Sequence, residues 1–100
     1  MKRSDFNTII ELPIEFDGRS STKGFKFKQV YHNNGWYIYE VKGEYYEVFK
    51  EKIVKAMEYD NGWNTIEGVG KVTYPCDEDF GNSAWTYRNY EKALKRIEKS

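Results

Sequence analysis

The chain has 100 residues, with 16 basic and 16 acidic side chains that give a formal net charge of zero. This length fits a single domain (1–100) with one modest core, and the balanced charge excludes both a polycation built for nucleic acid and an acidic DNA mimic. Cys76 is the only cysteine, so no intramolecular disulfide can form. No apolar run approaches the about 20 residues that a membrane span needs. Together these features predict a cytoplasmic protein.

The N-terminal part of the chain contains one clear strand signal. Residues 1–7 are polar and are expected to be disordered. From Thr8 to Phe16 apolar and polar side chains alternate, a period of two that predicts a β-strand. Pro13 cannot donate a ladder hydrogen bond, so this strand is placed at a sheet edge. Residues 17–24 are loop by composition.

The first hairpin of the predicted sheet lies in the most aromatic part of the chain. Residues 25–32 and 36–42 are the predicted strands, joined by a three-residue turn at 33–35 that ends in glycine. The register that follows from this turn pairs Lys28 with Glu40, which places opposite charges face to face.

A second turn at 42–43 returns the chain along a third predicted strand, which runs to about Val54. This register pairs Trp36 with Phe49. The apolar side chains of residues 44–59 also fit helical spacing, so a helix remains an alternative for this segment.

The C-terminal part predicts two further strands and a helix. Residues 69–74 and 84–87 are the strands, and Asn89 is a suitable N-cap for a helix over 90–99. The fold class is therefore α+β: a meandering antiparallel sheet of four to six strands with one C-terminal helix packed on one face. The pattern leaves open which face the helix covers.

Groups that could carry catalysis or bind a metal are scarce. A nucleophilic dyad would have to combine His32 with Cys76, and the carboxylates at 77–79 oppose formation of the thiolate. Those three acids lack the spacing of a calcium loop, and the chain has too few thiolates and imidazoles for zinc. The sequence predicts a protein that is not an enzyme and uses no cofactor or metal.

The aromatic sheet is the best candidate for function. Its apolar side chains point to both faces, and one short helix can cover only one of them. The other face would be an apolar patch edged by lysines, which is typical of an interaction surface. The alternative is that the 8–16 strand or residues 55–68 cover this face. The candidate binding residues are Trp36, Ile38, Tyr45, Phe49, Lys26, Lys28 and His32.

The favoured function is a non-catalytic protein-binding module whose partner is another protein. A single-stranded nucleic-acid-binding domain is the alternative, because bases can stack on aromatic rings while lysines meet the backbone. A membrane partner is not expected, and association of two copies stays open.

Four strings in the C-terminal half carry a resemblance: YEVFK at 46–50, YPCDEDFG at 74–81, AWTY at 84–87 and EKAL at 91–94. They resemble small uncharacterised proteins of phages, plasmids and other mobile elements. The resemblance implies an accessory or inhibitor protein that binds and blocks a host protein. No catalytic residue carries over.

Overall fold

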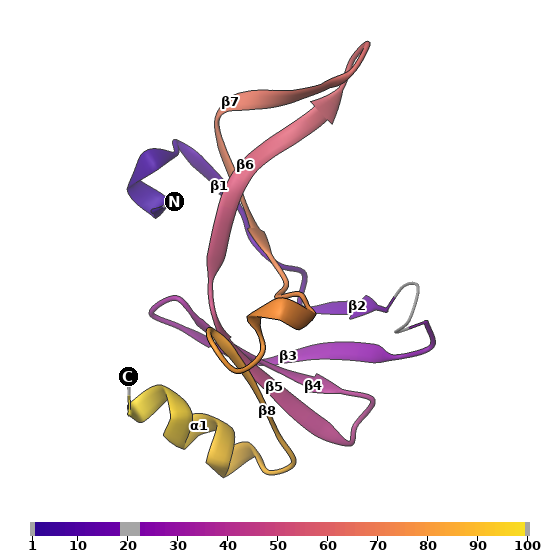
Figure 1. The fold of residues 1–100 in the computed structure, drawn as a ribbon, viewed down its shortest axis with the longest axis vertical. Coiled ribbons are helices and arrows are strands. Elements are labelled where there is room, and N and C mark those ends of the chain that lie inside the picture. The colour runs from indigo at the N-terminus through magenta and orange to yellow at the C-terminus, as the bar shows by residue number, and fades with distance from the viewer. Residues whose placement is uncertain (1, 19–22, 100) are drawn as a thin grey trace. The chain divides into compact units, whose positions relative to one another are not determined.

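The structure is a computed structural model that describes residues 2–18 and 23–99. The chain divides into two compact units, each described separately below (Figure 1). The hairpin unit comprises Met1–Leu12 and Glu51–Tyr74, and the sheet unit comprises Pro13–Lys50 and Pro75–Ser100. The α+β class predicted from the sequence is confirmed, but the strands form two sheets where one was expected.

The sheet unit contains the predicted meander. Its antiparallel strands lie in the order β2-β3-β4-β5-β8, and helix α1 packs on one face of the sheet (Figure 1). Asn89 caps α1 as expected, because its side-chain oxygen accepts the backbone N–H groups of Glu91 at 2.8 Å and Lys92 at 3.3 Å. The elements are β2 (Glu15–Asp17), β3 (Lys26–Asn33), β4 (Trp36–Val41), β5 (Tyr45–Lys50), β8 (Ala84–Tyr87) and α1 (Tyr90–Glu98).

The first turn is one residue shorter than predicted. Asn34 and Gly35 both have positive φ, 50° and 81°, so they form the two-residue connection that suits the twist of a hairpin. The Lys28–Glu40 pair is confirmed. The register shifts between Gln29 and Tyr31, and this bulge absorbs the residue that the prediction had placed in the turn.

The second turn is one residue longer than predicted, and this changes the faces of β5. Val41 pairs with Tyr45, so three residues form the connection. Trp36 therefore lies opposite Lys50 rather than Phe49. Because side chains alternate along a strand, this shift by one residue moves Phe49 to the face opposite Trp36.

The hairpin unit is built on two long antiparallel strands, with the order β1-β7-β6 (Figure 1). Its first strand pairs in parallel with β7. Within residues 44–59, Tyr45–Lys50 and Lys52–Tyr59 are β-strands, so the helical alternative for this segment is wrong. The 8–16 strand and the 44–54 strand of the prediction are each divided between the two sheets. The elements of this unit are β1 (Thr8–Ile10), β6 (Lys52–Tyr59) and β7 (Trp63–Thr73).

Residues 2–7 belong to the hairpin unit. The disorder expected of residues 1–7 stays a prediction, and residue 1 lies outside the described residues. A short 3-10 turn, η1 (Arg3–Asp5), is followed by Phe6, whose ring lies directly over Gly70. A Cβ atom at position 70 would come within 2.7 Å of that ring, so glycine is required by the close approach. Arg3 forms ion pairs with Glu11 and Glu51, each at 2.7 Å.

The two faces of the five-stranded sheet are both apolar. On the helix face, Trp36, Ile38 and Val48 are buried together with Ala93 of α1. On the other face the rings of Tyr37, Tyr39 and Phe49 lie nearly parallel, and Phe16 stacks on Phe27 at 4.6 Å. A further 3-10 turn, η3 (Asp77–Asp79), precedes β8.

Candidate functional site

The residues proposed from the sequence as a binding surface do not form one exposed patch. Trp36 is 9% exposed and Ile38 is fully buried, both within the core beneath α1. Phe49 is 1% exposed on the opposite face, where its ring lies 5.5 Å from that of Tyr37. The expected exposed face with Trp36 and Phe49 is therefore wrong. The element that covers Trp36 and Ile38 is α1, and not the 8–16 strand or residues 55–68 given as the alternative.

The other proposed residues are also separated by the sheet. Lys26 and Lys28 are exposed on the helix face, and His32 is exposed on the other, with its ring stacked on Tyr37 at 4.0 Å. Tyr45 is half-buried, and burial together with the charges of Glu47 and Glu44 raises its pKa. These side chains do not converge on a common point.

Large exposed apolar side chains gather instead at the end of the β6–β7 hairpin. Tyr59 is 71% exposed, Trp63 is 69% exposed and Met57 is 51% exposed. Tyr59 pairs with Trp63 across the hairpin, and Met57 pairs with Thr65 two positions along each strand. Since residues two apart on a strand share a face, these three side chains lie on one face of the ribbon. We call Met57, Tyr59 and Trp63 the aromatic tip.

Local structure fixes the geometry of the aromatic tip. The turn at 60–62 has positive φ at Asn61 (54°) and Gly62 (133°), and the Asp60 N–H donates to the Gly62 carbonyl at 2.9 Å. The Asn64 amide donates to the Asp60 carbonyl at 3.1 Å. The rings of Tyr59 and Trp63 meet edge to face with centroids 5.6 Å apart, a favourable aromatic geometry.

The charges around the aromatic tip are mainly negative. Glu58, Asp60 and Glu67 are exposed carboxylates on the two strands and the turn, and Lys55 is the nearest lysine along β6. An exposed apolar patch with an acidic edge favours apolar or cationic ligands and opposes phosphate groups.

The aromatic tip was not predicted, because the candidate residues were chosen where aromatic side chains are most frequent along the sequence. Trp63 and Tyr59 stand apart from the aromatic run, on either side of the turn signal Asp-Asn-Gly. Two large aromatics that flank a tight turn lie at a loop tip, where no neighbouring strand can cover them. That signal was present in the sequence.

The two groups considered for catalysis, Cys76 and His32, each contact another side chain. Cys76 donates its backbone N–H to the Asp79 carboxylate at 3.0 Å, and its thiol lies 3.4 Å from the same oxygen. The imidazole of His32 stacks on Tyr37. Over residues 2–18 and 23–99, no group of three or more His, Cys, Asp and Glu side chains is arranged to hold a metal ion.

Comparison with protein-family models, with curated protein sequences and with solved structures finds no match for this chain. The described residues contain no helix with both the length and the apolar character needed to cross a bilayer.

Proposed function

We propose that the chain is a non-catalytic protein-binding module and that the aromatic tip is its docking surface. The observation that supports this is the exposure of three large apolar side chains on one face of a hairpin end. Tyr and Trp are favoured interface anchors, because each buries about 150–250 Å² and loses little conformational freedom. These side chains are too exposed to contribute much to a core, and the contact between the Tyr59 and Trp63 rings still leaves most of their apolar surface open to solvent.

The partner that fits is a protein with an apolar pocket edged by lysine or arginine. Met57, Tyr59 and Trp63 would enter the pocket, while Asp60 in the turn would meet the basic edge; Glu58, on the opposite face of the ribbon, adds to the local negative charge. Such complementary charges raise the association rate and fix the orientation of the two proteins. The same carboxylates disfavour a nucleic-acid or anionic membrane surface at this position.

No observation favours single-stranded nucleic-acid binding through the residues first considered for it. Stacking would need the rings of Trp36 and Phe49 at the surface, and both are buried on opposite faces. Inhibition of a host protein by a phage or mobile-element accessory protein stays the prediction that the sequence resemblance implies.

The test compares proteins captured by the wild-type chain with those captured by a Tyr59→Ser/Trp63→Ser variant. The matched control is Ile10→Ser/Ile14→Ser, which removes exposed apolar side chains (46% and 66% exposed) away from the aromatic tip. A captured protein is then purified and titrated against all three chains by calorimetry.

The proposal predicts that the tip variant loses at least about 10-fold in affinity for the captured protein, equivalent to about 1.4 kcal/mol. The control should bind as the wild type does, with a negative heat-capacity change in both cases. Equal losses in the two variants would contradict the assignment. A wild-type dimer that dissociates in the tip variant would show that the tip binds a second copy instead of a different protein.

A further inference from the structure

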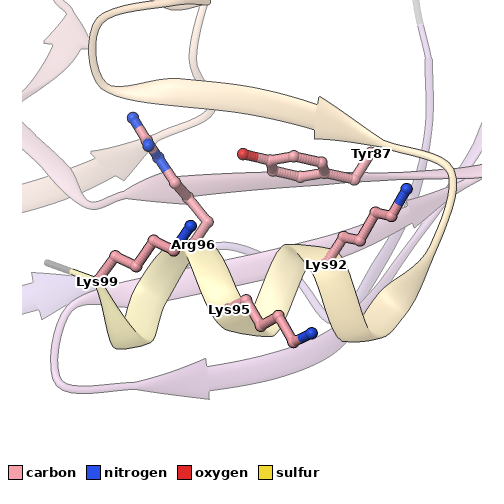
Figure 2. A pocket seen from close by; sticks show the side chains of 5 residues that line it. All are labelled: Tyr87, Lys92, Lys95, Arg96 and Lys99. Atoms are coloured by element: carbon pink, nitrogen blue, oxygen red, sulfur yellow. The ribbon is translucent and has the colours of Figure 1, made fainter.

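A second surface, in the sheet unit, carries a dense group of positive charges. Tyr87 of β8, three cationic side chains of α1 and Lys99 at its C-terminal end line a hollow of about 170 Å³ on the surface. Figure 2 shows Arg96 and Lys92 on either side of the Tyr87 ring, with Lys99 beside Arg96. The four cations are Lys92, Lys95, Arg96 and Lys99.

These lysines have no acidic partner. Within the described part of the chain, no carboxylate lies within ion-pair distance of Lys92, Lys95 or Lys99. A second hollow on the sheet unit differs in this respect, because Lys26, Lys28 and Lys42 share it with Glu15 and Glu40. The residues that line the α1 hollow include no carboxylate, and Glu91 and Glu98 lie elsewhere on the helix, so in a chain with no net charge the hollow is locally positive.

The core of the sheet unit fixes this cationic group in place. Ala93 is fully buried, and Leu94 and Ile97 pack against the same apolar cluster, so the apolar side of α1 faces the sheet. The Arg96 guanidinium carbon lies 3.7 Å from the centroid of the Trp85 ring, which restrains that side chain by a cation–π contact. A helix with its apolar side buried in this way has none left to enter a lipid interface.

The helix dipole does not account for the group. Lys95, Arg96 and Lys99 stand near the C-terminus of α1, where positive charge is favourable. Lys92 lies in the first turn, where positive charge is unfavourable, yet it lines the same hollow. The helix dipole therefore gives no reason for a lysine at position 92.

We propose that this hollow binds phosphate groups and that its ligand is the backbone of a nucleic acid. Lys92 and Lys99 are seven residues apart on a helix, which is a span of about 10 Å at 1.5 Å per residue. Neighbouring phosphates along one strand rise by about 3.4 Å in duplex DNA, so the row of cations covers two or three of them. The hollow is open to solvent, which suits a continuous backbone better than a single enclosed phosphate.

The test measures binding of a fluorescently labelled single-stranded oligonucleotide by anisotropy, at about 50 mM salt and at higher salt. The test variant is Lys92→Gln/Lys99→Gln, which leaves the Arg96–Trp85 contact in place. The matched control is Lys26→Gln/Lys28→Gln, which removes the same charge from the mixed-charge hollow of the same unit. Inorganic phosphate and polyglutamate are added as competitors in separate arms.

The wild type should bind with an affinity that falls linearly with the logarithm of salt. The α1 variant should lose about 10-fold in affinity, and its salt slope should flatten by about 1.4, since each phosphate contact on a single strand contributes about 0.7. The control should change by less than about 2-fold. Inorganic phosphate at the same total phosphate concentration should compete poorly, since it meets the cations singly.

Four results would overturn the proposal. The wild type fails to bind at low salt, the two variants lose affinity equally, or polyglutamate competes as well as unlabelled oligonucleotide. Strong competition by inorganic phosphate would also overturn it, by showing a site for a single free anion. The variants lie on α1 and not on the aromatic tip, so this outcome is independent of the proposed protein-binding function.

Discussion

The two units place their aromatic side chains in opposite environments. In the sheet unit Tyr37, Tyr39 and Phe49 are at most 1% exposed, whereas Tyr59 and Trp63 of the hairpin unit are 71% and 69% exposed. In the sheet unit these rings pack against one another in the core, on one face of the sheet. The hairpin unit presents its rings to solvent at the end of a ribbon, where their main ring contact is with each other. The number of aromatic residues in a segment therefore does not identify a binding surface.

The largest expected effect on this comparison is the loss of stability when one aromatic residue is substituted in each unit. Phe49→Ala should lower the free energy of unfolding by about 3–5 kcal/mol, because it leaves a cavity in a packed stack. Trp63→Ser should lower it by about 1 kcal/mol or less, because the side chain is exposed and loses mainly its contact with the Tyr59 ring. Urea denaturation followed by circular dichroism measures both. A loss from Trp63→Ser as large as that from Phe49→Ala would show that the tip is packed in the folded protein.

The next largest effect concerns the close approach of the Phe6 ring to Gly70 in the hairpin unit. Gly70→Ala should lower stability by about 1–3 kcal/mol, because the new methyl group overlaps the Phe6 ring and the ring must move. In a Phe6→Ala background the same substitution should cost less, with a coupling of about 1 kcal/mol between the two positions. Hydrogen exchange locates the change. Additive losses would show that the ring does not rest on Gly70.

The pH dependence of stability sharpens the account of the sheet unit. Burial raises the pKa of Tyr39 above its ordinary value of 10.0, against the opposing effect of the Gln29 amide, which donates to its hydroxyl. A raised folded-state pKa gives stability that is fully present below about pH 10 and is lost as the pH rises through the folded value.

Tyr39→Phe should therefore lower stability by about 1 kcal/mol near neutral pH, since the hydrogen bond to the Pro13 carbonyl is lost. Above about pH 10 the variant should lose less further stability than the wild type. Denaturant titrations on both sides of that pH test this. The same alkaline loss in both proteins would contradict the role given to Tyr39; Tyr45 and Tyr46, whose pKa values burial also raises, would then carry it.

The smallest effect is expected at the ion pairs of Arg3. Hydrogen bonds to Glu11 and Glu51 raise the pKa of this arginine, but the groups are partly exposed. Arg3→Gln should cost no more than about 1 kcal/mol at low salt, and the difference should shrink as salt is added. Thermal denaturation at two salt concentrations measures it. A salt-independent loss would indicate that Arg3 acts through packing.

Much of the fold follows from local signals. The capped helix after Asn89, the strand at 84–87 and the Lys28–Glu40 pairing were predicted from residue patterns and confirmed. Turn lengths were harder to predict from the sequence, because Asn33-Asn34-Gly35 fits both a two-residue and a three-residue connection. An error of one residue there is enough to exchange the two faces of a strand.

The division into two sheets could not be predicted from the sequence. Residues 8–16 and 44–54 each have the alternation of one continuous strand, and nothing local indicates that each run contributes to both sheets. The two pieces of the predicted strand, β1 and β2, do lie at sheet edges, but Pro13 itself falls between them and is in neither strand. The site was predictable in principle, since Tyr59 and Trp63 flank a strong turn signal.

Quenching of tryptophan fluorescence by acrylamide tests the central contrast most directly. Of the three tryptophans, Trp63 is 69% exposed and Trp36 is 9% exposed. Trp85 is partly buried, with the Arg96 guanidinium over its ring, so Trp63 should dominate the quenchable emission. Substituting Trp63→Phe should shift the emission maximum to shorter wavelength and greatly reduce quenching, while Trp36→Phe should leave quenching almost unchanged. If Trp63→Phe leaves the quenching of the free protein as it was, the aromatic tip is not at the surface and the docking site assigned to it does not exist.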